Sequence, residues 1–121
     1  MDLYREEILD HYKNPRNFGD LKDFNSKAAD RNSSCGDILE MGIKTKAGKI
    51  TEVRFSGVGC AISLASASML TEMLKGKTLN EAGKIDDAAM LKRLGIPISL
   101  TRQKCATLGV AIWQKLKPQL K

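Results

Sequence analysis

Apolar and polar residues alternate in the middle of the chain, whereas apolar residues recur at helical spacing on both sides of it. The alternating stretches are residues 39–43 and 53–55, and they flank a turn-forming segment at 46–49. Alternation with a period of two predicts a β-hairpin with one buried and one solvated face. The polar stretch at 16–34 lacks any such period, and we expect a loop there.

Helical spacing predicts an opening helix, a central helix, two short helical pieces and a long final helix. Gly76 is placed to cap the central helix, and Asp86 or Asp87 to begin the second short piece. The expected segments are 4–12, 61–75, 79–83, 86–94 and 101–117. Strands followed by helices, with no linker or repeat between them, predict a single α+β domain over residues 1–121.

The chain is basic, and most of the excess positive charge lies in its last third. The formal net charge is +6 over 121 residues, and seven Lys or Arg against two Asp occur from residue 86 onward. No dense basic run or interleaved aromatic residue accompanies this charge, so we expect an acidic protein surface as partner and no nucleic acid. No apolar stretch reaches bilayer-spanning length and the first residues are charged, so we expect no membrane partner and a cytoplasmic location.

Three cysteines and one aspartate carry the candidate chemistry: Cys35, Asp37, Cys60 and Cys105. Three thiols cannot all pair in disulfides. Isolated thiols beside small or positively charged residues are typical of metal binding or sulfur acceptance in a reducing compartment. A free cysteine is also common as a small buried apolar residue. Three thiols in such settings, with a matching carboxylate, favour the functional interpretation.

The predicted elements place each of these residues at the end of an element, where they can converge. Cys35 and Asp37 enter the first hairpin strand, and Cys60 follows the second. Cys105 falls in the first turn of the final helix. The N-terminus of that helix, together with Lys104, is expected to lower the pKa of the Cys105 thiol.

The four side chains make a set of three thiolates and one carboxylate. Soft sulfur selects zinc or an iron–sulfur cluster, and the carboxylate leaves one weaker, exchangeable position. Gly57 and Gly59 are expected to leave room near Cys60 for a bulky inorganic ligand. The Cys-x-x-Cys pairs of structural zinc sites are absent from the sequence. We therefore expect a metal site that is assembled by the fold.

Ordered motifs run through nearly the whole chain: Leu3-Tyr4-Arg5, Asp10-His11-Tyr12-Lys13-Asn14-Pro15-Arg16-Asn17, Cys35-Gly36-Asp37, the segment from Gly57 to Leu70, Lys75-Gly76-Lys77, and Lys104-Cys105-Ala106-Thr107-Leu108. In these motifs the chain resembles the U-type iron–sulfur assembly proteins, a family that includes IscU, the N-terminal domain of NifU, and SufU. The resemblance implies a small antiparallel sheet with helices packed on one face. It also implies a scaffold on which Cys35, Asp37, Cys60 and Cys105 hold a transient [2Fe–2S] cluster. Such a scaffold takes sulfur from a cysteine desulfurase and hands the cluster to apo-proteins or carrier proteins.

The subtype within this family is open. IscU-type members carry His directly before the third Cys and a Leu-Pro-Pro-Val-Lys segment, where this chain has Lys104 and a different sequence at 94–98. Both features resemble SufU, whose members bind zinc through the three Cys and the Asp and accept persulfide sulfur from their desulfurase. SufU-type members carry an insertion between the second and third Cys that this chain lacks. We expect a non-enzymatic scaffold, with a zinc-dependent sulfurtransferase and a purely structural zinc protein as alternatives.

Sulfur that arrives as a persulfide needs one thiol as its first acceptor. Cys105 is the candidate favoured by nearby charge, and Cys35 is the competitor that the SufU resemblance favours. His11, the single histidine, lies in the opening helix. We expect it to have a structural or surface role rather than to bind metal. The oligomeric state stays open.

Overall fold

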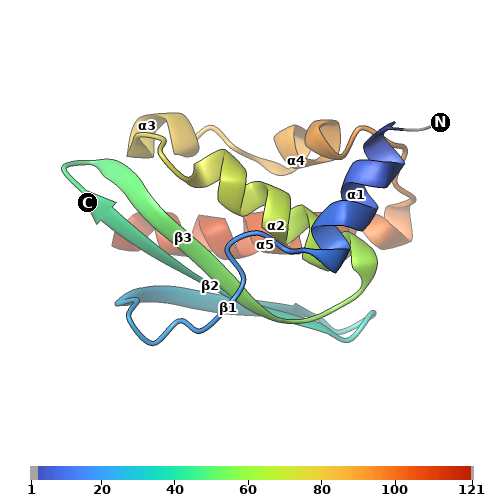
Figure 1. Cartoon of the computed structure of the whole chain (residues 1–121), viewed down its shortest axis with the longest axis horizontal. Coiled ribbons are helices and arrows are strands. Elements are labelled where there is room, and N and C mark those ends of the chain that lie inside the picture. The colour runs from blue at the N-terminus through green and yellow to red at the C-terminus, as the bar shows by residue number, and fades with distance from the viewer. Residues whose placement is uncertain (1–2, 121) are drawn as a thin grey trace.

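The computed structural model describes residues 3–120 and has a small sheet beside a layer of helices (Figure 1). Its elements in chain order are α1 (Leu3–Lys13), β1 (Ser26–Asn32), β2 (Asp37–Lys46), β3 (Lys49–Val58), α2 (Ala61–Leu74), α3 (Leu79–Ala82), α4 (Asp87–Leu94), α5 (Leu100–Leu116) and the 3₁₀ helix η1 (Lys117–Gln119). None of the described helices has the length and apolar character needed to cross a membrane.

The three strands form one antiparallel sheet in the order β1-β2-β3. β2 and β3 are the predicted hairpin, with Met41 opposite Phe55. β1 lies within the segment expected to be a loop, so that expectation is wrong for residues 26–32. The only apolar side chains of β1 are two alanines, which give a weak periodic signal. Its strand conformation depends on hydrogen bonding to β2. That pairing joins distant residues, so the local sequence pattern of β1 does not predict it.

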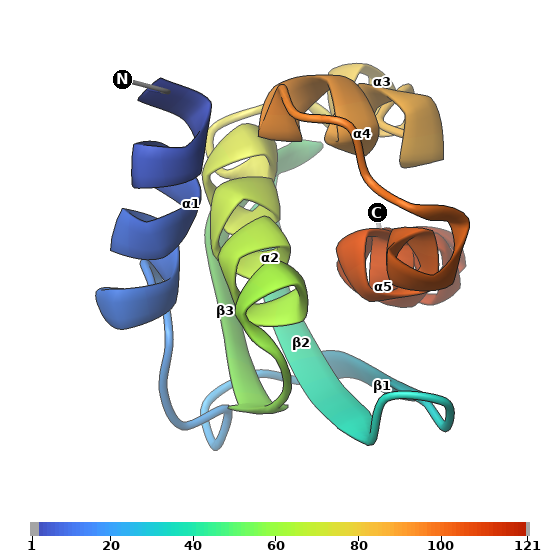
Figure 2. The same ribbon diagram turned by 90° about the vertical axis from the view of Figure 1, so that its right-hand side faces the viewer.

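The helices cover one face of the sheet, as Figure 2 shows. α2 lies over β3, α5 lies over β1 and β2, and α1 packs on the side of α2 away from α5 (Figure 2). α4 contacts both α2 and α5. The predicted α+β arrangement with helices on one face is confirmed.

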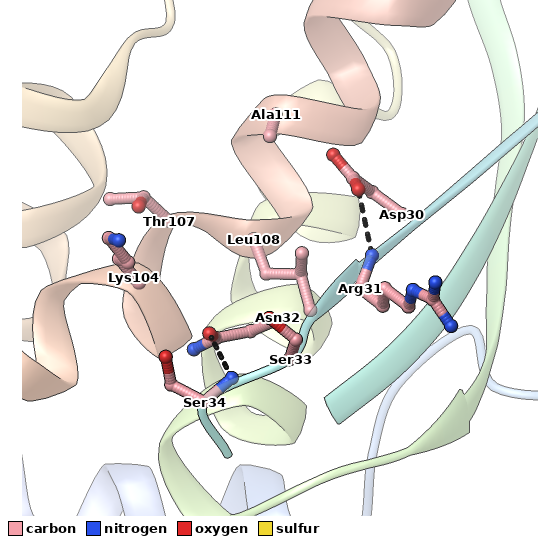
Figure 3. A pocket seen from close by; sticks show the side chains of 9 residues that line it. All are labelled: Asp30, Arg31, Asn32, Ser33, Ser34, Lys104, Thr107, Leu108 and Ala111. Atoms are coloured by element: carbon pink, nitrogen blue, oxygen red, sulfur yellow. Dashed lines mark hydrogen bonds between the residues drawn. The ribbon is translucent and has the colours of Figure 1, made fainter. Parts of the chain in front are cut away.

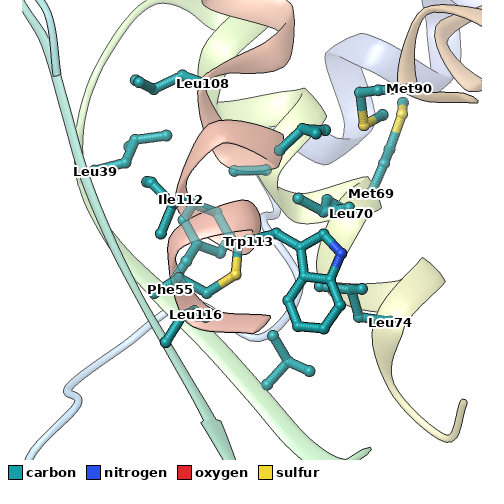
Figure 4. Packing of buried hydrophobic residues seen from close by; sticks show 14 of the residues in the cluster. Leu39, Phe55, Met69, Leu70, Leu74, Met90, Leu108, Ile112, Trp113 and Leu116 are labelled. Atoms are coloured by element: carbon teal, nitrogen blue, oxygen red, sulfur yellow. The ribbon is translucent and has the colours of Figure 1, made fainter. Parts of the chain in front are cut away.

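The core fills the space between the sheet and helices α2 and α5 (Figure 4). Trp113 is completely buried, and its indole Nε1–H donates a hydrogen bond to the carbonyl oxygen of Ala82 at 3.1 Å, which ties α5 to α3. The other large buried side chains come from the sheet and both helices and include Leu39, Met41, Phe55, Met69, Leu70 and Leu74. Burial of each such side chain contributes about 1.5–3 kcal/mol, so this packing fixes where the element ends meet.

Two predicted helix ends lie close to their expected positions. Asp86 is the N-cap of α4, and its carboxylate accepts a hydrogen bond from the backbone N–H of Ala89 at 2.9 Å. Gly76 was expected to cap the central helix; α2 ends at Leu74 with Lys75 as its C-cap, and Gly76 is the next residue, where a glycine with positive φ commonly ends a helix. Gly76 has a φ of +84° and donates its N–H to the carbonyl oxygen of Ile50 in β3, so it joins α2 to the sheet.

His11 has the expected structural role, because its side chain connects α1 to α2 through polar contacts. The residue is 3% exposed, with Nδ1 2.7 Å from Ser68 Oγ and Nε2 3.5 Å from a Glu72 carboxylate oxygen. Burial lowers the pKa of His11, and the positive charges of Arg16 and Arg93 lower it further against the opposing effect of Glu72. The neutral imidazole is therefore the native form.

The stability of the metal-free protein is expected to fall on mild acidification because of His11. The unfolded chain takes up the proton near the ordinary value of 6.5, and the folded chain does so at a lower pH. Between these two values the unfolded state binds more protons, so the free energy of unfolding decreases as the pH falls below about 7. Urea unfolding at several pH values measures this slope. His11→Gln should flatten it, and equal slopes in both proteins would contradict the assignment.

Candidate metal centre

The structure brings the four predicted site residues together at one end of the sheet, where β2 begins and β3 ends. The Sγ atoms of Cys35 and Cys105 are 3.1 Å apart. One ligand atom each from Cys35, Asp37 and Cys105 lies within 4.8 Å of the other two. Cys60 stands at the edge of this group, with its Sγ 3.9 Å from Asp37 Oδ2.

The turn between β1 and β2 positions Cys35. The carbonyl oxygen of Asn32 accepts hydrogen bonds from the backbone N–H of Cys35 at 3.1 Å and of Gly36 at 2.9 Å. Gly36 has a φ of +72°, a conformation that glycine adopts without strain. Asp37 follows, and it pairs with Asn32 in the β1–β2 ladder. This pairing fixes the backbone position of Asp37, whose side chain is completely buried.

Asp37 in turn holds the segment that carries Cys60. Its Oδ1 accepts a hydrogen bond from the backbone N–H of Cys60 at 2.9 Å. Cys60 is the N-cap of α2, and its Sγ accepts a hydrogen bond from the backbone N–H of Ser63 at 3.5 Å. The sulfur therefore faces the positive end of the α2 dipole.

The need for glycine at positions 57 and 59 has a different reason from the one predicted. A β-carbon at Gly57, where φ is +139°, would lie 2.1 Å from the carbonyl oxygen of Ile38 in β2. A β-carbon at Gly59 would lie 2.3 Å from Ser63 Oγ and 3.0 Å from Asp37 Oδ1. The expectation that they make room for an inorganic ligand is wrong, because atoms of the protein fill that room. The glycines permit the close approach of β2, β3 and the start of α2.

The three thiols differ in exposure. Cys35 is exposed, Cys60 is partly exposed and Cys105 is completely buried. Burial raises the pKa of the Cys105 thiol well above its ordinary value, and its hydrogen bonds with Cys35 and the other site residues act in the same direction. The prediction that Cys105 ionises readily is therefore wrong for the metal-free protein.

Cys105 lacks the environment that the sequence suggested, for two reasons. α5 begins at Leu100, so Cys105 is beyond its first turn, where the effect of the helix dipole has faded. Lys104 is exposed and lines a neighbouring pocket between β1 and α5 (Figure 3), because successive residues of a helix do not face the same side.

Asn32, which the sequence pattern did not predict as a site residue, contacts the site with both its side chain and its backbone. Its side chain is 7% exposed, and Nδ2 donates a hydrogen bond to Cys105 Sγ at 3.5 Å. Asn32 ends β1, the strand that the sequence did not predict. The polar residues before Cys35 carry no signal that singles out one of them, so only the fold identifies it.

The donor set fits a thiophilic metal. The sulfur atoms of Cys35 and Cys105 lie close to a carboxylate oxygen of Asp37, and the sulfur of Cys60 lies at the edge of this group. All three cysteines are free. Cys35, Cys60, Cys105 and Asp37 match the ligand types that zinc and iron–sulfur clusters accept. His11 contacts Ser68 and Glu72 of α2.

Fold and donor set together define a class of small α+β proteins in which three thiols and a carboxylate meet at the end of a three-stranded sheet. Residues 3–116 match the family described as NifU-like N terminal domain, and the chain belongs to this family. The resemblance inferred from the sequence motifs is thereby confirmed.

Curated relatives include both subtypes of this family. The chain is 40% identical to the iron–sulfur cluster assembly scaffold protein IscU 1 of Archaeoglobus fulgidus, over 88% of this chain and 69% of that protein. It is 39% identical to the zinc-dependent sulfurtransferase SufU of Bacillus subtilis, over 95% of this chain and 87% of that protein.

Solved structures give the same fold. A protein of Fervidobacterium islandicum, described as a candidate iron–sulfur cluster assembly scaffold for the SUF system, superposes with a TM-score of 0.80 at 26% identity, covering 93% of this chain and 94% of that one. The NifU-like N-terminal protein of Brucella abortus shares the fold at a TM-score of 0.76 and 21% identity, covering 96% of this chain and 92% of that one.

Proposed function

We propose that this chain is a scaffold for iron–sulfur cluster assembly, with a labile [2Fe–2S] cluster as its product and Cys35, Asp37, Cys60 and Cys105 as the ligands. The observation that carries the proposal is the meeting of ligand atoms from Cys35, Asp37 and Cys105 within 4.8 Å in a member of the NifU-like family. Thiolate sulfur suits iron in clusters, and a carboxylate in place of a fourth thiolate makes a weaker bond that eases release.

Cys35 is the thiol best placed to receive sulfur, because it is exposed on the β1–β2 turn. In the proposed transfer, the Cys35 thiolate attacks the terminal sulfur of a persulfide on a cysteine desulfurase. One S–S bond forms on Cys35 while the S–S bond of the donor breaks, and the donor cysteine leaves as a thiolate. The exchange needs no added oxidant or reductant. Cys105, which the sequence favoured, is buried and does not offer its sulfur to another protein.

The desulfurase and the apo-protein acceptors are the proposed partners. Exposed basic residues beside the site, Arg102 and Lys104, suit an acidic surface on such a partner. Other basic residues of the last third are already used within the chain: Arg93 pairs with Glu7, and Lys115 pairs with Asp30.

The second candidate function is a zinc-dependent sulfurtransferase. It is favoured by Lys104, which stands where IscU-type members have His, and by a SufU relative that aligns with 95% of this chain. Zinc bound at the site would hold the thiolates ionised and oriented. The chain would then accept sulfur from the desulfurase and pass it on, without building a cluster.

Anaerobic incubation with ferrous iron, free cysteine, a cysteine desulfurase and a thiol reductant, which reduces the persulfide sulfur to sulfide, separates these functions. A scaffold is expected to gain visible absorption together with iron and acid-labile sulfide, and to pass both to an apo-ferredoxin. Cys60→Ser should lose this product because a ligand is missing, whereas Ser33→Ala on the β1–β2 turn should keep it. Stimulated desulfurase turnover with zinc bound and no visible chromophore would favour the sulfurtransferase. If the folded protein shows neither activity, the remaining alternative is a structural zinc protein.

A further inference from the structure

We propose that Asn32 is the positioning residue of the metal centre, and that its side-chain amide donates a hydrogen bond to the sulfur of Cys105 when that sulfur binds metal. The inference rests on the proposed function only in requiring that the site hold a thiophilic metal. It goes beyond that function because it assigns a role to a residue outside the set of four ligands.

Asn32 is connected to three of the four ligands. Its backbone carbonyl oxygen accepts the hydrogen bonds that close the turn around Cys35. It pairs directly with Asp37 in the β1–β2 ladder. Its side-chain Nδ2 lies 3.5 Å from Cys105 Sγ, across 73 residues of sequence. One buried residue therefore sets the relative positions of the turn, the first residue of β2 and the thiol on α5.

The orientation of the Asn32 amide follows from its other contact. Asn32 Oδ1 accepts a hydrogen bond from the backbone N–H of Ser34 at 3.3 Å (Figure 3). Because a backbone N–H can only donate, the oxygen has to face Ser34, and the NH₂ group has to face Cys105. The donor is thus directed at the sulfur by the fold.

The turn alone does not explain an asparagine at this position. A Ser or Asp side chain could also accept the hydrogen bond from Ser34, as in other short turns of this type. Only the amide adds a neutral donor that reaches Cys105. A metal-bound thiolate is negatively charged, so an N–H donor stabilises and orients it, and a neutral donor does so without competing for the metal.

Zinc affinity in a double-mutant cycle tests the inference. Asn32→Ser keeps an oxygen for the turn and removes the donor to Cys105, so we expect its zinc dissociation constant to rise on the order of 10-fold. In a Cys105→Ala background, the same substitution should change the constant less than about twofold, because the sulfur it acts on is gone. Competition with a chromophoric chelator measures all four proteins. Asn80→Ser, at an exposed position on α3, is the matched control.

Three outcomes would overturn the proposal. Wild-type zinc affinity in Asn32→Ser would show that the donor has no effect, and an equal loss in both backgrounds would show that Asn32 acts only through the turn. A wild-type protein that binds no zinc would overturn this inference together with the proposed metal site, and so differs from the first two. If Asn32→Ser does not fold, the wild type loaded with an NMR-active cadmium isotope decides. Coupling between the metal and the Asn32 amide protons is expected, and its absence would refute the hydrogen bond.

Discussion

Cys35→Ser is expected to abolish persulfide formation on this chain after a single desulfurase turnover, whereas Cys105→Ser is expected to retain it. The acceptor has to present its sulfur to another protein, and Cys35 is the exposed thiol of the site. Cys105 is 0% exposed, and burial raises its pKa, so little thiolate is present there in the metal-free protein. We expect the persulfide signal of Cys35→Ser to fall below roughly a tenth of the wild-type signal.

Mass spectrometry of the intact chain and of its peptides measures this result under non-reducing conditions. Cys60→Ser is the matched control, because it removes another thiol of the site that is only partly exposed. Equal persulfide on wild type and Cys35→Ser, together with its loss in Cys105→Ser, would return the acceptor role to Cys105. That result would require α5 to open when the desulfurase binds.

Removal of zinc from the loaded protein is expected to lower the melting temperature by about 15 °C. A metal present at roughly 1,000 times its dissociation constant adds about 4 kcal/mol to the folded state. For a domain of this size, 1 kcal/mol corresponds to roughly 4 °C. The effect is large because the ligands come from the β1–β2 turn, the start of α2 and α5, which are separate parts of the chain.

Calorimetry with and without a chelator measures the shift, and hydrogen exchange locates it. Protection should decrease at the β1–β2 turn and at the start of α5, while the core around Trp113 keeps its protection in the folded ensemble. Added zinc should restore the melting temperature, and added magnesium should not, because its preferred ligands are oxygen atoms. An unchanged melting temperature after verified metal removal would contradict the prediction.

The hairpin, the main helices and the identity of the candidate ligands could be predicted from the sequence. Period-two alternation and helical spacing record which face of an element is buried, so β2, β3, α2 and α5 were expected near their observed positions. Cys35, Asp37, Cys60 and Cys105 were distinguished by residue type and by family motifs, both of which are local properties of the chain. Their placement at element ends was enough to predict that they converge.

The tertiary structure decided what depends on contacts between distant segments. β1 exists through its ladder with β2, and Asn32 faces the site only because β1 lies beside α5. Exposure of the thiols is also non-local: Cys105 is buried by elements that pack over α5, although the three residues before it in the sequence are polar or charged. Local charge therefore favoured Cys105, whereas the burial of Cys105 and the exposure of Cys35 favour Cys35 as the proposed acceptor. A sequence can show which groups are able to react, but packing sets their solvent access, and solvent access sets which of them ionise.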